Sequence, residues 1–175
     1  MKALKTVIDN GARVRDALET LSDPAKILRK SVASYEKWCY RDSGLDRASY
    51  IPILSVGSTT GLFESVGEVV DRLTLSLREL AARHRAAAKN DPEAMDDLPV
   101  LFGIIIADTV TAFVSYDPHE VEGEARNVAV LNWKDDGQDI WNGLAIAILI
   151  ITVRNMVLDR GTWPASRATS TDGDR

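Results

Sequence analysis

The stretch LPVLFGIIIADTVTAFVSY, residues 98–116, is almost entirely apolar and decides the expected fold class. Its side chains from Val100 to Ala107 would cover every side of a helix, which is typical of a helix that is buried all round. A second stretch, residues 139–158, carries no charged residue between Gly143 and Val153. We therefore predict two apolar helices packed together at the centre of the protein, with Ile105 and Ile148 in its core.

The segments on either side of these two stretches have the spacing of amphipathic helices. Residues 3–21 and 61–89 place apolar side chains at helical intervals, and a further helix follows Asp23 and Pro24, which suit its N-cap and its first position. A modest helix is predicted after Asp117-Pro118. Residues 45–60 predict an extended connector, because Pro52 disfavours a strand there.

These segments together predict an all-α fold, a single-domain helical bundle of about five to six helices. The bundle domain would span residues 1–160, and the polar residues 161–175 would form a flexible C-terminal tail. The composition, 45% hydrophobic and 27% charged, is that of a globular protein, and the 6% of aromatic residues favours helix packing over a β-sandwich.

The same residues bear on the location of the protein. The N-terminus lacks an apolar signal segment and Cys39 is the single cysteine, so we expect an intracellular, cytoplasmic protein with Cys39 as a buried packing residue. Asp108 and Arg154 interrupt the two apolar stretches and argue against membrane spans. A bundle that conceals an apolar hairpin and opens onto a membrane remains an alternative.

One string has the pattern of a metal site. Asp135, Asp136 and Asp139 fit D-D-x-x-D, which resembles the aspartate-rich motif of isoprenoid synthases. The resemblance implies carboxylates that hold Mg²⁺ and, through it, a diphosphate. The alternative, which we adopt, is a solvated turn in which Gly137 precedes a helix capped by Asp139. On that interpretation the chain uses no metal and no cofactor.

The Gly/Ser/Thr-rich residues 55–61 and the two histidines could each serve a binding site, but a structural role is favoured for both. Residues 55–61, rich in Gly, Ser and Thr, lack the Gly-Lys-Ser/Thr ending of a phosphate-binding loop and predict a capped helix entrance. His84 extends an apolar stripe and predicts a packing residue, whereas His119 stands among carboxylates that predict a solvated first helical turn.

One basic segment has interleaved aromatic residues. It offers a weak candidate for contact with nucleic acid or a protein partner, formed by Lys26, Arg29, Lys30, Lys37 and Arg41. Tyr35, Trp38 and Tyr40 lie among these cations, but the net charge of −5 disfavours non-specific binding to phosphate.

The charges divide along the chain. Residues 1–90 carry 15 Lys and Arg against 11 Asp and Glu, whereas residues 91–175 carry 6 against 15. Oppositely charged halves favour association of copies, so we expect a non-enzymatic protein that acts through protein–protein contacts, as a homo-oligomer (a coat or filament subunit) or as an adaptor. The alternatives are a membrane-active bundle and a Mg²⁺-dependent enzyme.

Overall fold

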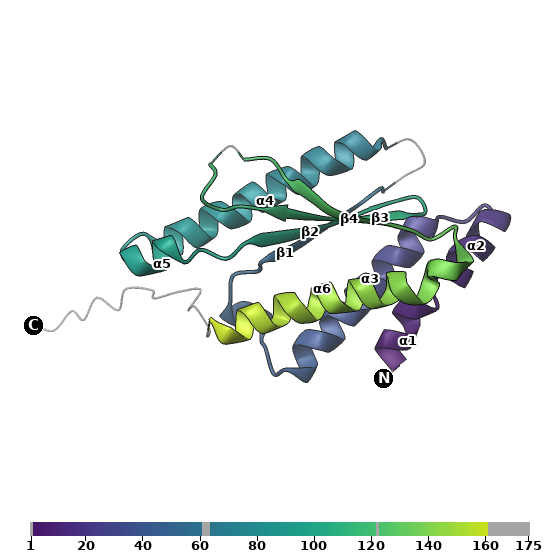
Figure 1. Ribbon diagram of the computed structural model, residues 1–175, viewed down its shortest axis with the longest axis horizontal. Coiled ribbons are helices and arrows are strands. Elements are labelled where there is room, and N and C mark those ends of the chain that lie inside the picture. Colours follow the sequence, from purple (N-terminus) through teal and green to yellow (C-terminus); the bar gives the residue numbers. More distant parts are fainter. Residues whose placement is uncertain (1, 61–63, 122, 161–175) are drawn as a thin grey trace, which may run out of the picture.

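The fold is a four-stranded mixed sheet with helices on both faces (Figure 1), so the prediction of an all-α bundle is wrong. The computed structural model describes residues 2–60, 64–121 and 123–160. The elements in chain order are α1 (Lys2–Ile8), α2 (Asn10–Glu19), α3 (Pro24–Asp42), the 3₁₀ turn η1 (Arg47–Ser49), β1 (Leu54–Ser58), α4 (Val66–Ala88), α5 (Pro92–Asp96), β2 (Leu101–Ala107), β3 (Val110–Tyr116), β4 (Arg126–Asn132), the 3₁₀ turn η2 (Asp136–Gln138) and α6 (Asp139–Asp159).

The sheet order is β1-β2-β3-β4. Strands β1 and β2 are parallel and are joined through α4, while β2, β3 and β4 form an antiparallel meander. Helix α4 lies on one face of the sheet, and α1, α3 and α6 lie on the other (Figure 1). Strand β1 forms one edge of the sheet and β4 the other.

Residues 98–116 form the β2–β3 hairpin instead of a helix. Ala107 pairs with Val110, and the two-residue loop between them begins at Asp108, whose φ is 51°. Strand β2 is interior to the sheet and is covered by helices on both faces, so the side chains on both of its faces must be apolar. A strand buried in this way has the same all-round hydrophobicity as a buried helix, and periodicity does not separate the two.

Other segments also differ from their predicted structure. The extended connector contains β1, and the helix expected after Pro118 is replaced by a turn and β4. The first predicted helix is divided at Asp9 into α1 and α2. Helices α3, α4 and α6 are confirmed, with the Asp23 carboxylate accepting a hydrogen bond from the Lys26 backbone N–H at 3.1 Å. The predicted tail, residues 161–175, lies outside the described residues.

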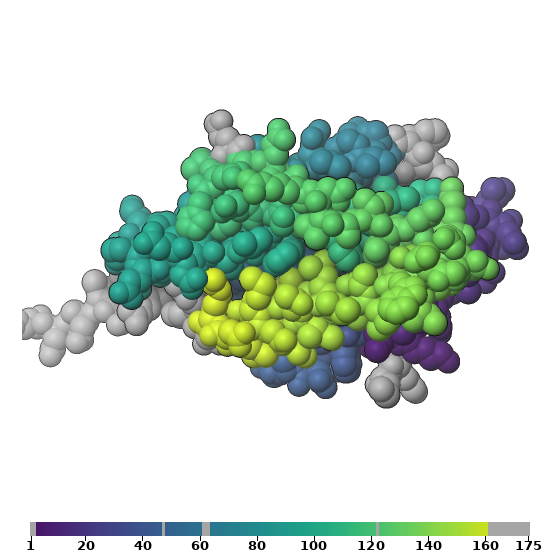
Figure 2. All heavy atoms as spheres, viewed as in Figure 1, coloured from purple at the N-terminus to yellow at the C-terminus, as the bar shows by residue number. Residues whose placement is uncertain are grey.

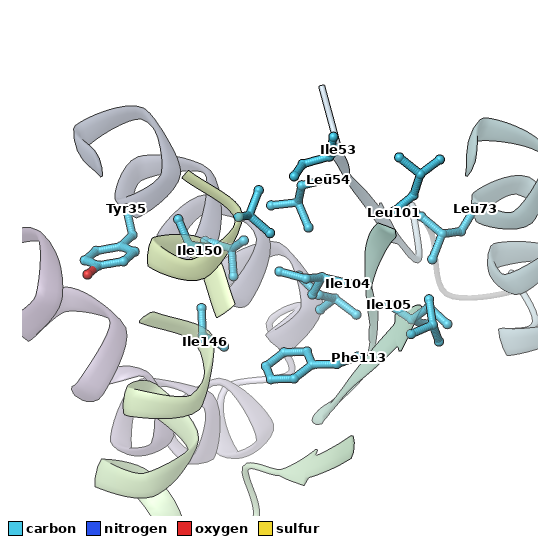
Figure 3. Close-up of a cluster of buried hydrophobic side chains, with 14 of the residues drawn as sticks. Tyr35, Ile53, Leu54, Leu73, Leu101, Ile104, Ile105, Phe113, Ile146 and Ile150 are labelled. Carbon is cyan, nitrogen blue, oxygen red and sulfur yellow. The ribbon is translucent and has the colours of Figure 1, made fainter. Parts of the chain in front are cut away.

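The core has one part on each face of the sheet (Figure 3). On one face, Ile146 and Ile150 of α6 pack towards Ile104 and Phe113. On the other, Leu73 of α4 lies beside Leu101 (Figure 3). Strand β2 therefore contributes to both parts of the core.

Helix α6 is pinned to the N-terminal helices by a glycine. A Cβ atom added at Gly143 would lie 2.7 Å from the Cα atom of Ile8, so only glycine permits this separation between α1 and α6. The contact buries one face of α6 and directs the opposite face to solvent. Ile148 is accordingly 61% exposed, and its predicted place in the core is wrong, whereas Ile105 is buried as predicted.

We predict that Ile104→Ala and Ile148→Ala have unequal effects on stability. Ile104 is fully buried, so its truncation should lower the free energy of unfolding by about 2–5 kcal/mol. The same truncation at Ile148 should change it by less than about 0.5 kcal/mol. Urea denaturation followed by circular dichroism measures both, and equal losses would contradict the placement of α6.

Candidate interaction surface

The aspartates of the D-D-x-x-D string do not converge on a metal site. Both carboxylate oxygens of Asp139 accept hydrogen bonds from the Arg15 guanidinium, at 2.9 and 2.7 Å. Asp135 accepts the Gly137 backbone N–H at 3.0 Å, and Asp136 is exposed. Within the described ranges, no three His, Cys, Asp or Glu side chains form a group that could hold a metal ion. Asp139 therefore joins α6 to α2, and its predicted role as the cap of the helix is wrong, because it is the first residue of α6 and Gln138 stands at the N-cap position.

Gly11 makes this junction possible. A Cβ atom at Gly11 would lie 1.7 Å from Oδ1 of Asp139, so any other residue at position 11 collides with the carboxylate. The ion pair between Arg15 and Asp139 raises the pKa of Arg15, chiefly through its hydrogen bonds to that carboxylate. Arg15 also reaches the Trp133 carbonyl at 3.4 Å and so fixes the segment that follows β4.

We predict that Gly11→Ala lowers the free energy of unfolding by about 1–3 kcal/mol, because the added methyl group displaces Asp139. In an Asp139→Ala background the same change should cost less, since the colliding atoms are gone. A double-mutant cycle measured by urea denaturation checks this coupling.

Gly67→Ala is the matched control for Gly11→Ala. A Cβ atom at Gly67 meets its nearest neighbour at 3.8 Å, and the position lies in the first turn of α4. This substitution should raise the free energy of unfolding by about 0.4–1 kcal/mol. Strictly additive effects in the Gly11 and Asp139 cycle would contradict the proposed collision.

Residues 55–58 belong to β1, and the described residues that follow, 59–60 and 64–65, form a capped entrance to α4. Ser65 and Glu68 form a reciprocal capping box, so the cap of α4 is a serine that lies beyond residues 55–61, the segment in which a cap is predicted. Glu64 accepts hydrogen bonds from the Thr60 backbone N–H and hydroxyl at 2.6 and 2.8 Å, and it pairs with Arg72. These carboxylates occupy the donors that an anion would need. Gly61 lies outside the described residues.

The pKa of Glu64 is lowered to about 2, first by Arg72 and then by the two hydrogen bonds from Thr60. A carboxylate with a depressed pKa stabilises the folded state at pH values above its ordinary pKa of 4.5, and this stabilisation is lost as the pH falls towards 2. We predict that Glu64→Gln is less stable than the parent near neutral pH and equal to it near pH 2. Thermal melts across this range measure the difference.

The five predicted contact cations share one face of α3. Their spacing along the helix places them together, and all of them are exposed: Lys26, Arg29, Lys30, Lys37 and Arg41. Tyr35 and Tyr40 are buried, and Trp38 is half-buried with its ring centroid 5.5 Å from that of Tyr35. This face can attract an anionic surface by charge, but it presents no exposed aromatic side chain on which a base could stack.

The predicted packing residues are confirmed. His84 is buried, with Nε2 3.1 Å from the Pro52 carbonyl, and burial lowers its pKa. Cys39 is fully buried, and desolvation raises the pKa of its thiol. His119 is exposed, and its backbone N–H donates to Asp117 at 2.9 Å. None of these groups is arranged as a nucleophile or a ligand.

Strand β4 is an uncovered edge of the sheet. The Trp133 backbone N–H donates a hydrogen bond to the Thr109 carbonyl at 2.9 Å, towards β3. Backbone groups alternate in direction along an antiparallel strand, so those of Asn132 and Val130 point away from β3, towards solvent. The Asn142 side chain covers the Asn132 carbonyl at 2.8 Å. Val130 is 58% exposed, and β4 contains no proline or lysine of the kind that normally protects an edge.

Helix α6, which meets this edge through Asn142, carries an exposed apolar stripe. The stripe consists of Trp141, Leu144 and Ile148, which repeat at helical spacing on the side opposite the core, whereas Ile151 packs against the core. Trp141 is 68% exposed and Ile148 is 61% exposed, whereas Leu144 is half-buried. Figure 2 shows β4 and α6 on one face of the molecule. We call the β4 edge and this stripe the β4–α6 surface.

Sequence reasoning missed the β4–α6 surface for two reasons. Residues 126–132 were assigned partly to a helix, so no sheet edge was expected there. The exposed side of α6 was assigned to the core, because its side chains are as apolar as those that pack on β2 and β3. The β-branched residues Val128 and Val130, at alternate positions of residues 126–132, were the available signal for a strand.

No protein-family model matches this chain, and neither the curated proteins nor the solved structures contain a significant match to it.

Proposed function

We propose that this protein acts through protein–protein association and that two copies associate through the β4–α6 surface. The observations that support the proposal are the outward-facing backbone groups of β4 and the exposed apolar residues Trp141 and Ile148 of α6, an element that lies with β4 on one side of the molecule (Figure 2). Exposed patches of this kind mark interaction sites in soluble proteins. An edge strand adds a partner strand through its backbone, and neighbouring apolar side chains supply the hydrophobic contact.

A second copy of the chain is the partner that satisfies both parts of the surface. Two β4 strands that pair antiparallel are related by a two-fold axis perpendicular to the sheet, so each contributes the same groups to the interface. The same axis brings the two α6 helices to one side of the joined sheet. Strand β4 has one charged residue, Arg126 at its first position, so the pairing of two β4 strands does not bring several like charges close together.

The two-fold arrangement favours a closed dimer over an open filament. A head-to-tail contact would need two different complementary surfaces, whereas the β4–α6 surface complements itself. The expected intracellular location remains part of the proposal and is compatible with Cys39, a buried free thiol.

A membrane-active role has less support. The hairpin that was expected to enter a bilayer included residues 98–116, which are strands paired on both sides in the sheet. Among the described residues, one helix, Asp136–Asp159, is long and apolar enough to cross a membrane by length and composition. Its face towards α1 is closely packed at Gly143, and Asp139 is held by Arg15. Insertion would have to break both contacts.

We predict that the purified chain has a molar mass of twice 19.2 kDa by size-exclusion chromatography with light scattering. Val130→Lys places a charge on the sheet edge, and Ile148→Glu places one in the α6 stripe. Each should raise the dimer dissociation constant about tenfold or more, since a desolvated charge at an interface costs more than about 1.4 kcal/mol.

Leu75→Lys is the matched control, because Leu75 is 58% exposed on the solvent side of α4, away from the β4–α6 surface. It should leave the dimer unchanged. A strict monomer at high protein concentration would contradict the proposal, as would flotation of the monomer with anionic liposomes.

A further inference from the structure

Helix α4 covers only half of the sheet face on which it lies. Helix α4 packs on β1 and β2, whereas the same face of β3 and β4 borders an open groove of about 1150 Å³. Val70 and Thr74 form its α4 wall, and Ala112 and Val114 form its floor. Leu18 and Leu21, from the turn between α2 and α3, lie at one end. We call this feature the α4 groove.

The α4 groove has the dimensions of one helix. Two strands occupy about 10 Å across a sheet, and an α-helix with its side chains is about 10–12 Å wide. The floor from Val110 to Val114 extends over about 14 Å, which corresponds to about nine helical residues. Small side chains at Ala107 and Ala112 permit a close approach to the floor.

The charge of the groove is one-sided. Asp108 ends the hairpin at the Leu18 end, and Asp23 and Glu64 line the same end. None of the lining residues, all of which lie in the described part of the chain, is Lys, Arg or His. Glu64 is neutralised by Arg72, whereas Asp108 is exposed and Asp23, also exposed, accepts a hydrogen bond as the N-cap of α3. The opposite end, at Ala125 and Asn127, carries no charge.

We infer that the α4 groove binds an amphipathic helix of another protein, with an apolar stripe on the floor and a basic first turn at the Asp23 and Asp108 end. The N-terminal end of a helix carries positive partial charge, so an acidic end favours this direction. Fatty acids and anionic lipids would place negative charge at the same acids. Helix α6 of another copy is also disfavoured, because Asp135, Asp136 and Asp139 precede or begin it.

The test is fluorescence anisotropy with a labelled helical peptide of about ten residues. Its leucines repeat at helical spacing, and two lysines stand in its first turn. A second peptide of the same composition has its lysines in the last turn. We expect saturable binding of the first peptide and binding about fivefold weaker or more for the second. Equal affinity of the two, or no binding of the first, would overturn the inference.

Thr74→Arg places a bulky cation on the α4 wall and should weaken binding of the first peptide about tenfold or more. Leu75→Arg, one residue away on the solvent side of the same helix, is the matched control and should bind as the parent does. Asp108→Asn keeps a residue that tolerates positive φ and should weaken binding about twofold to fivefold. Unchanged affinity in Thr74→Arg would overturn the inference.

This inference does not depend on the proposed dimer. Ile148→Glu alters α6 on the opposite side of the sheet, so it should abolish the dimer without weakening peptide binding. Thr74→Arg should have the reverse pattern, with normal molar mass and weak peptide binding. Loss of both activities in Ile148→Glu, with the protein still folded, would contradict the assignment of two separate surfaces.

Discussion

The burial of β2 on both faces is the constraint on which the rest of the structure depends. Ile104 and Ile106 are fully buried on the face towards α3 and α6, and Ile105 is buried on the face towards α4. This strand therefore supplies apolar side chains to both layers of helices. Since β2 also pairs with β1 and β3, it joins the crossover through α4 to the antiparallel meander. The two parts of the core therefore meet at one strand.

The sequence predicted helices α3, α4 and α6 but failed at residues 98–116, a segment that is apolar on both faces. Helices α3 and α4 have polar faces, and the start of α3 follows from Asp23 and Pro24, whereas the start of α4 after the Ser65 cap was not predicted. In residues 98–116 the decisive signals were local. Three isoleucines and three valines with β-branched side chains favour a strand, and Asp108-Thr109 is a polar pair of the length of a hairpin loop. All-round hydrophobicity outweighed both in the prediction.

The same ambiguity affected the candidate sites. The D-D-x-x-D spacing predicted convergent carboxylates, but a partner 124 residues away in the sequence, Arg15, engages Asp139. No local pattern shows such a pairing. The shared face of the α3 cations was predictable, because it depends only on helical spacing. The exposed stripe of α6 was not, since exposure of an apolar helix depends on which side its neighbours cover.

Unequal covering of the sheet connects the two proposed surfaces. Helices α1, α3 and α6 pack on one face, and α4 alone packs on the other, so the β3–β4 half of that second face is open. Pairing of two β4 strands about an axis perpendicular to the sheet would place two α4 grooves side by side on one face of the joined sheet, and the two α6 stripes together on the opposite face. The α6 stripes would then be buried by the dimer while the grooves stay accessible. Two linked grooves bind a partner that carries two helices more tightly than one groove does, because the second contact forms at a high effective concentration. A dimer of this kind acts as an adaptor through its geometry, without catalytic residues.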